Sequence, residues 1–538
     1  MTNGEKKRRN PHGRLRPALG ALSGAVAGFA ALAVAELVSG WVRPQAGPVI
    51  AVGGAAIDRT PAAVKSWAVR NFGTDDKLVL EFGILFVLAL FALALGVLAL
   101  RHRRSGSAGV LLFGAVGAAA AVGRPDSTGL TDTLPSAAGA VVGAGLLFLL
   151  VGRLGIRDPA PGRPGVPGGD TFEGPQWERR GFVLAASAAA AASVGAGALG
   201  RVLNGSSGRD AVASRDDLVL PAPASPAPAV PEGARSRVSG ISPFTTPNRS
   251  FYRVDTALVV PKVDATAWRL RIHGLGVARP VTLSFDDLLR QELIERDITL
   301  TCVSNEVGGP YVGNARWLGI RLADLLAECG VRPPSGGGPA DQLVARSVDG
   351  MTIGSPVEDV MDGRDALLAV GMNGEPLPFE HGFPVRMVVP GLYGYVSACK
   401  WIKDIELTTF DAYDPYWVRR EWARRAPVKT QSRIDTPKPF ARPRAGTVMV
   451  GGVAWAQHRG IDKVEVRVDD GPWRQARLAA EDSRDTWRQW SFPWQATKGG
   501  HTLTVRATDR TGAVQTEKRA RTVPDGASGR HSVVVTVD

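Results

Sequence analysis

Five long apolar segments in the first 200 residues constrain this chain more than any other feature of its sequence. A hydrocarbon core of about 30 Å needs roughly 20 mainly apolar residues in one helix. The segments run from Ala18 to Val38, Leu78 to Leu100, Gly109 to Gly123, Leu134 to Val151 and Gly181 to Gly200. We therefore expect residues 1–200 to form a membrane region with about five transmembrane helices.

The basic residues beside these segments predict an orientation. KKRR at Lys6–Arg9, RHRR at Arg101–Arg104 and the connection from Arg153 to Arg180 share one side of the membrane if the segments alternate. Lysine and arginine are enriched on the cytoplasmic side, so we expect the N-terminus inside and everything after Gly200 outside. The loop from Val42 to Lys77 fits less well, because it places five basic residues on the predicted outer side.

A possible export signal precedes the fifth segment. ERRGFVL at Glu178–Leu184 leads into an alanine-rich apolar run and resembles a twin-arginine signal, which serves proteins that fold before export. The domain that follows would then acquire any cofactor inside the cell. A chance arginine pair at a cytoplasmic helix end is the alternative.

Charge and cysteine content narrow the class of protein. Much of the excess behind the net charge of +13 sits beside the apolar segments, and no basic stripe is interleaved with aromatics, so we expect no nucleic-acid binding. The three cysteines include no Cys-x-x-Cys pair, so neither a zinc ribbon nor c-type haem attachment is encoded. His12 and His102, the histidines of the membrane region, lie outside the apolar segments, and we expect no haem in this chain.

The remaining residues divide into three parts by pattern. PAPASPAPAVPEG marks residues 201–240 as a Pro/Ala-rich linker, expected to be an extended, semi-rigid spacer. Residues 241–428 mix short strands (WRLRIHG, ERDITLTC) with helical spacing (SFDDLLRQ), which predicts an α+β domain with a mixed sheet. Residues 429–538 alternate as in KVEVRVDDGPW and HTLTVRATDRTG, which predicts an all-β sandwich of immunoglobulin type.

Two groups of residues in the α+β part could carry chemistry. Cys302 ends an alternating strand and enters a loop with Asn305 and Gly308, where a cofactor can approach closely, although a lone cysteine is more often a buried core residue. Further on, His381, Arg386 and Lys400 lie among glycines and prolines that force tight turns. Cationic side chains on such a scaffold suit an anionic, phosphate-bearing ligand.

The motifs TPNRSFYRV, TCVSNE and ARWLGIRLADLL, with the block from Asn373 to Leu407, resemble those of the sulfite oxidase family of molybdopterin enzymes. The part from Lys429 onward resembles the β-sandwich that follows the molybdopterin domain in many members and often mediates dimerisation. The resemblance implies a molybdopterin-binding oxidoreductase domain over residues 241–428. The orientation predicted for the apolar segments would place this domain outside the cytoplasm.

The resemblance also implies roles for individual residues. Cys302 would ligate molybdenum, whose other ligands are the pterin dithiolene and oxygen atoms. Arg253 and Asp255 would stand with Cys302 at the catalytic centre, and the positions matched to cofactor binding are Asn248, Cys302, His381, Arg386 and Lys400. Arg316 and Trp317 match a structural element of the family.

Departures from sulfite oxidases proper weaken the attraction of the pocket for an anion. Val307 stands where those enzymes have an arginine that binds the oxyanion, Asp255 replaces a histidine, and Lys403 and Asp404 replace two arginines. We therefore expect two-electron oxygen-atom transfer on a sulfoxide or another S- or N-oxide. A sulfite-oxidising enzyme and, from another class, a non-catalytic surface binding protein are the alternatives. A separate cytochrome or quinone-linked partner would carry the electrons, and a homodimer is expected.

Overall fold

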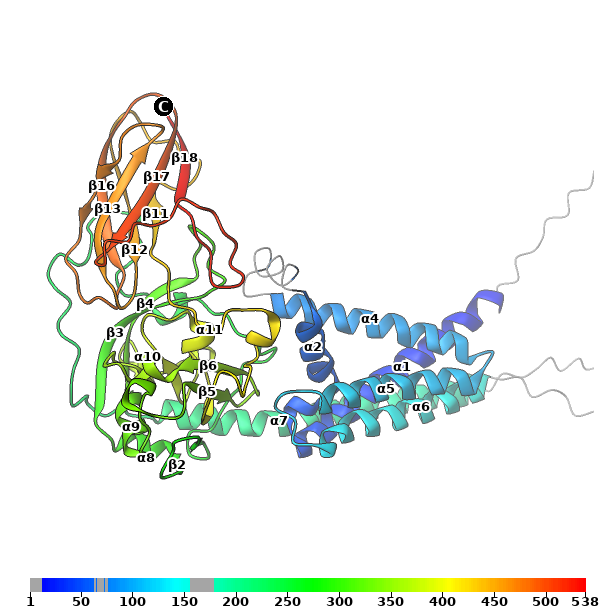
Figure 1. Ribbon diagram of the computed structural model, residues 1–538. Coiled ribbons are helices and arrows are strands. Elements are labelled where there is room, and N and C mark those ends of the chain that lie inside the picture. Colours follow the sequence, from blue (N-terminus) through cyan, green and yellow to red (C-terminus); the bar gives the residue numbers. More distant parts are fainter. Residues whose placement is uncertain (1–11, 62–63, 65–71, 73–75, 155–178) are drawn as a thin grey trace, which may run out of the picture. The chain divides into compact units, whose positions relative to one another are not determined.

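The computed structural model describes residues 12–61, 64, 72, 76–154 and 179–538. The chain forms two compact units, shown in Figure 1: a helical unit of residues 1–209 with 256–259, and a sheet unit of residues 210–255 with 260–538. KKRR at Lys6–Arg9, Glu178 and most of the Arg153–Arg180 connection lie outside the described residues.

Five helices in the described part of the helical unit are long and apolar enough to cross a membrane. They are α1 (His12–Val42), α4 (Asp76–Ala99), α5 (Arg103–Val122), α6 (Leu134–Leu154) and α7 (Arg179–Asp216). The five predicted apolar segments are therefore helical, and the third is longer than its apolar run because α5 begins in the RHRR sequence. Short helices η1 (Pro44–Ala46), α2 (Pro48–Arg59) and η3 (Leu130–Thr133) lie in the connections.

Small residues allow these helices to approach closely. A Cβ atom added to Gly24 of α1 would overlap the Ala92 carbonyl of α4, and one added to Gly139 of α6 would overlap the Ala31 carbonyl of α1. Close backbone approach at glycine is typical of helix association in a membrane, where burial of apolar surface gives no driving force.

A buried ion network joins the connection after α1 to the connection between α5 and α6. Arg43 contacts Asp126 at 3.0 Å and Asp132 at 2.7 Å, and Arg124 contacts Asp126 at 2.8 Å. Ser127 Oγ also donates to Asp132 at 2.9 Å. Arg43 is one of the five basic residues that fit the predicted orientation less well, and its charge is neutralised locally.

The first part of the sheet unit contains two five-stranded sheets, as expected for an α+β domain. One has the order β2 (Val281–Ser284), β1 (Arg269–Gly274), β10 (Ile402–Thr408), β5 (Gln342–Ser347), β6 (Thr352–Pro356). It is mixed, because β1 pairs in parallel with β10 and the other pairs are antiparallel. The other contains β3 (Leu293–Thr301), β4 (Val312–Arg321), β7 (Leu367–Met372) and β8 (Glu375–Pro376), with β9 (Arg386–Val388) on β7.

Short helices connect these strands: η4 (Asn248–Ser250), α8 (Phe285–Leu289), α9 (Leu322–Glu328), η5 (Pro334–Gly336), α10 (Val357–Met361), η6 (Phe379–His381), α11 (Gly394–Ser397) and η7 (Val418–Arg420). Ser284 begins α8 as the pattern predicts. Its hydroxyl accepts a hydrogen bond from Asp287 N at 3.2 Å, and the Asp287 carboxylate accepts one from Ser284 N at 2.8 Å. This reciprocal cap satisfies donors that the first turn of a helix leaves free.

The last part of the sheet unit has two four-stranded antiparallel sheets. One orders β11 (Gln431–Thr436), β12 (Gly446–Trp455), β16 (Arg488–Ala496) and β15 (Arg477–Leu478). The other orders β14 (Arg474–Gln475), β13 (Ile461–Val468), β17 (Gly499–Asp509) and β18 (His531–Val537). Alternate residues of both sheets, such as Val450, Val464 and Phe492, form one apolar core. We call residues 431–537 the C-terminal sheets.

The segment 201–240 differs from the expected extended, semi-rigid spacer. Helix α7 continues to Asp216, so the first 16 residues of the predicted linker are helical. The proline-rich part then lies along β3, where Ala224 N donates to Leu293 O at 2.8 Å and Arg296 Nη1 donates to Ser225 O at 3.1 Å. Composition alone overlooked these backbone contacts, which require no large apolar side chain.

Candidate functional site

Cys302 lies in a loop that leaves the end of β3 and returns at the start of β4. The loop is closed by three hydrogen bonds: Cys302 N donates to Tyr311 O at 3.0 Å, Asn305 N to Cys302 O at 3.0 Å, and Tyr311 N to Asn305 Oδ1 at 2.8 Å. Cys302 is 8% exposed and Asn305 is 7% exposed. We call residues 302–311 the cysteine loop.

A second group of predicted residues forms an ion cluster. Lys400 Nζ lies 3.0 Å from Asp255 Oδ2, and Arg253 Nε lies 2.9 Å from the same oxygen. Lys400 Nζ also donates to Glu380 O at 2.9 Å. One carboxylate therefore holds two cationic side chains that are separated by about 150 positions in the sequence.

The third group joins Asn248, His381 and Arg386. His381 Nε2 lies 3.0 Å from Asn248 O, which can only accept, so the proton is on Nε2 and Nδ1 is free to accept. Arg386 Nη1 donates to His381 O at 3.0 Å, and the guanidinium lies 4.9 Å from the centre of the Trp317 ring. The side chain of Asn248 is fixed by Asn373 Nδ2, which donates to its Oδ1 at 2.7 Å.

Burial and mutual repulsion shape the electrostatics of this cluster. Burial, then the charges of Lys400 and Arg386, lower the pKa of His381 to about 3, so its imidazole is neutral. Burial also lowers the pKa of Arg386 to about 10 and lowers that of Lys400, where Asp255 acts in the opposite direction. Burial raises the pKa of the Cys302 thiol, while hydrogen bonds from Ser304 and the positive charge of Lys400 act against this rise. Cys302 and Lys400 are thus close enough to interact.

The buried side chains of this site could bind an anionic cofactor that carries hydrogen-bond donors and acceptors. His381 Nδ1 and Arg386 Nε are buried and have no hydrogen-bond partner among the described residues. A buried polar atom without a partner costs roughly 1–3 kcal/mol, so such atoms in a native site point to a bound group. One open acceptor, one open guanidinium donor and a nearby thiol match a pterin ligand with an anionic tail and a metal.

Sequence reasoning missed three residues of this site. Burial raises the pKa of the Tyr252 hydroxyl, Cys302 raises it as well, and the charge of Arg386 acts in the opposite direction, so Tyr252 lies close to both side chains. Ser304 and Asn373 fix Cys302 and Asn248 respectively. Tyr252 and Ser304 fall inside the motifs TPNRSFYRV and TCVSNE, so proximity to Arg253 and Cys302 was an available signal; Asn373 had only its place at the start of the glycine-rich block.

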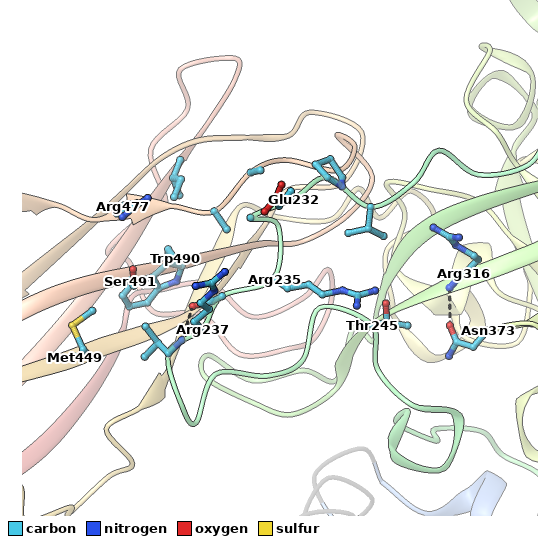
Figure 2. A pocket seen from close by; sticks show the side chains of 18 residues that line it. Glu232, Arg235, Arg237, Thr245, Arg316, Asn373, Met449, Arg477, Trp490 and Ser491 are labelled. Atoms are coloured by element: carbon cyan, nitrogen blue, oxygen red, sulfur yellow. Dashed lines mark hydrogen bonds between the residues drawn. The ribbon is translucent and has the colours of Figure 1, made fainter.

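A cavity of about 1410 Å³ opens near this site, between the segment 230–238, Arg316 of β4 and Trp490 of β16 (Figure 2). None of the seven predicted site residues lines it. Its wall includes Asn373, whose Oδ1 accepts a hydrogen bond from Arg316 N at 2.9 Å. Arg316 also forms an ion pair with Asp297 at 2.6 Å, which agrees with its predicted structural role.

Comparison with known proteins defines the class. Residues 257–417 match the model of the oxidoreductase molybdopterin binding domain. This segment contains Cys302, His381, Arg386 and Lys400, whereas Asn248, Arg253 and Asp255 precede it. The sheet unit therefore contains a molybdopterin-binding oxidoreductase domain.

Relatives identify the family. The chain is 31% identical over 293 residues to mitochondrial sulfite oxidase of Rattus norvegicus (46% of this chain, 53% of that protein). It is 33% identical over 189 residues to the uncharacterized oxidoreductase YuiH of Bacillus subtilis (strain 168), covering 34% of this chain and 89% of that protein. The chain belongs to the sulfite oxidase family of molybdopterin oxidoreductases, and it spans about half the length of the sulfite oxidases it matches.

A solved structure also matches. The sulfane dehydrogenase SoxCD from Paracoccus pantotrophus aligns with a TM-score of 0.48 and 26% identity, over 55% of this chain and 84% of that chain.

Proposed function

We propose that this chain is a membrane-anchored enzyme that transfers one oxygen atom and two electrons to or from a sulfoxide or another S- or N-oxide, outside the cytoplasm. The observation that carries the proposal is the buried cluster of His381, Arg386 and Lys400, in which His381 Nδ1 and Arg386 Nε have no partner among the described residues. The positive charge of Lys400 also acts on the Cys302 thiol. The family membership supports the reaction class, and the charge of the site supports the kind of substrate.

The residues have distinct roles in this proposal. Cys302 would ligate molybdenum, and Arg386, His381, Lys400 and Asn248 would hold the pterin and its anionic tail. When bound, the cofactor supplies the oxygen-atom and two-electron chemistry, for which no protein side chain is suited. The protein contributes a buried thiol that would bind the metal as a thiolate, a neutral His381 imidazole that accepts a hydrogen bond, and a site largely closed to water.

The charge balance favours a neutral substrate over sulfite. Asp255 contacts both Arg253 and Lys400, so one carboxylate offsets part of the charge of these two cations. Val307 adds no charge, and Asp404 of β10 pairs with His273 at 3.0 Å. An oxyanion would gain little from such a site, whereas the dipolar S–O or N–O group of a neutral oxide requires no ring of arginines.

A substrate screen tests the reaction. Purified protein, an artificial electron carrier, and sulfite, methionine sulfoxide and further S- and N-oxides would be compared. We expect reduction of at least one neutral oxide and sulfite turnover at least tenfold lower. Preferred sulfite oxidation would support the alternative that the chain is a sulfite-oxidising enzyme. A purified protein without molybdenum, from cells that make the cofactor, would favour a non-catalytic binding protein.

The location and partners are further parts of the proposal. Five alternating spans with the N-terminus inside would place the sheet unit outside, and a separate cytochrome or quinone-linked protein would exchange electrons with it. A reporter enzyme that works only outside the cytoplasm should then be active when it is fused after Asp538, and a reporter that works only in the cytoplasm should be inactive there. A Lys pair in place of Arg179 and Arg180 should reduce export if these residues act as a twin-arginine signal.

The C-terminal sheets are proposed to be an immunoglobulin-like sandwich that mediates dimerisation. Their two antiparallel sheets of four strands around one apolar core suit this classification. A molar mass of two chains in detergent, measured by light scattering, would support a homodimer.

A further inference from the structure

We infer that the C-terminal sheets hold the cysteine loop in place on both sides of Cys302, with Gln457 and Arg433 as positioning residues for the metal ligand. The inference rests on the proposed function, because it takes Cys302 as the molybdenum ligand. It gives the C-terminal sheets a role within the catalytic centre of the same chain, in addition to any role in dimerisation.

Gln457 holds the strand that leads into Cys302. It lies in the connection between β12 and β13 and is 1% exposed. Its Nε2 donates to Thr299 O and to Thr301 Oγ1, both at 2.9 Å, and Thr301 immediately precedes Cys302. One buried amide group thus fixes Thr299 and Thr301, at the end of the strand that leads into Cys302.

Two further hydrogen bonds extend this attachment along the outer edge of β3. Thr299 N donates to Asp485 O at 2.9 Å, and Trp487 N donates to Thr299 Oγ1 at 2.7 Å. Trp487 is 2% exposed, and its indole Nε1 donates to Phe244 O at 2.8 Å. The end of β3 is therefore paired with β4 on one edge and with residues of the C-terminal sheets on the other.

Arg433 holds the loop that follows Cys302. Its Nη1 donates to Gly309 O at 2.8 Å. The guanidinium is itself anchored by Asp435 at 2.7 Å and by Ser242 Oγ at 2.9 Å. Arg433 and Asp435 are buried, so the planar guanidinium is a fixed donor rather than a mobile surface group.

His531 packs against the same part of the loop. Gly308 has φ +81°, and a Cβ atom added to it would overlap the His531 ring. The ring is oriented by Ile434 N, which donates to Nδ1 at 3.0 Å. The His531 ring therefore leaves no room for a side chain at Gly308.

These contacts matter because a metal ligand needs a fixed direction. Groups that orient a ligand are typically worth roughly 10–100-fold in metal affinity or activity, although they never touch the metal. Gln457 acts before Cys302 and Arg433 acts after it, so their loss should tilt the thiolate without removing it.

The test uses the full-length protein purified in detergent, with Gln457→Met and Arg433→Lys. Arg459→Lys is the control. Arg459 is held by Asp509 of β17 at 2.9 Å and joins the C-terminal sheets to the preceding domain through Val428 O at 2.8 Å. Its hydrogen bonds and ion pairs go to residues other than those of the cysteine loop. Molybdenum per chain, thermal midpoint and the Mo(V) electron paramagnetic resonance spectrum after reduction would be measured for each.

We expect both test variants to change the g values of the Mo(V) spectrum and to lower turnover about tenfold. The Arg459→Lys protein should lose thermal stability while it keeps the wild-type spectrum. Wild-type spectra in both test variants at wild-type molybdenum content would overturn the inference while leaving the proposed function intact. A wild-type protein without molybdenum would overturn both. The test variants act on opposite sides of Cys302, so misfolding of one leaves the other decisive.

Discussion

Lys400 Nζ lies 3.0 Å from Asp255 Oδ2, and both side chains are at most 10% exposed. Removal of one partner leaves the other charge buried without compensation, which is far more costly than loss of the pair. We expect Asp255→Asn to lower the free energy of unfolding by about 3 kcal/mol. The double variant with Lys400→Met should recover at least half of this loss. Chemical denaturation of the cofactor-free protein would measure both, and strictly additive effects would contradict the coupling.

Arg386 should be unfavourable for stability and necessary for cofactor binding. Its guanidinium is buried, its Nε lacks a partner among the residues described, and burial lowers its pKa to about 10. Arg386→Met keeps the packing on Trp317 and removes the buried charge. We expect equal or higher thermal stability without cofactor, and at least a tenfold loss of bound pterin measured by fluorescence after oxidation. Normal pterin content would contradict this role.

Gly308 should tolerate substitution less well than a glycine of the same conformation in open space. Gly308→Ala combines a positive φ with overlap on His531, whereas Gly337 has φ +79° and nothing within 4 Å of an added Cβ. We expect a loss of about 3 kcal/mol for Gly308→Ala and about 1 kcal/mol for Gly337→Ala. Urea denaturation would compare the two variants. Equal losses of stability would show that the contact with His531 does not contribute to the effect at Gly308.

His531 should make stability depend on pH. Burial, then the charge of Arg433, lower its pKa to about 4, while an unfolded histidine titrates near 6.5. The unfolded state therefore takes up a proton first as pH falls, and stability declines between about pH 6.5 and pH 4. With allowance for partial exposure the loss is about 2 kcal/mol. His531→Gln should make the thermal midpoint depend less on pH in this range. An unchanged slope would show that other groups cause the loss of stability.

Hydrophobic length and local pattern predicted most of the architecture, because both act over short stretches. The five apolar helices, the strands WRLRIHG and ERDITLTC, and the start of α8 at Ser284 all follow from such patterns. The linker was the exception. Its attachment to β3 depends on backbone donors and acceptors, which composition does not reveal.

The candidate site could be predicted as a list of residues but not as an arrangement. Motif resemblance pointed to Asp255 and Lys400 separately, and only the fold shows that they form an ion pair. The contacts of Gln457 with the end of β3 and of Arg433 with the cysteine loop were beyond prediction, because each joins residues more than 100 positions apart in the chain.

The Mo(V) spectrum of the Cys302→Ser protein, measured together with its turnover, tests the central claim most directly. Cys329, which is also buried and lies at the end of α9, gives the matched control Cys329→Ser. Metal analysis and Mo(V) spectra of full-length protein would be compared with turnover of the best oxide substrate. We predict near-stoichiometric molybdenum in the wild type and in Cys329→Ser, and loss of both turnover and the wild-type spectrum in Cys302→Ser. Wild-type spectrum and turnover in Cys302→Ser would contradict the assignment of Cys302 as the metal ligand.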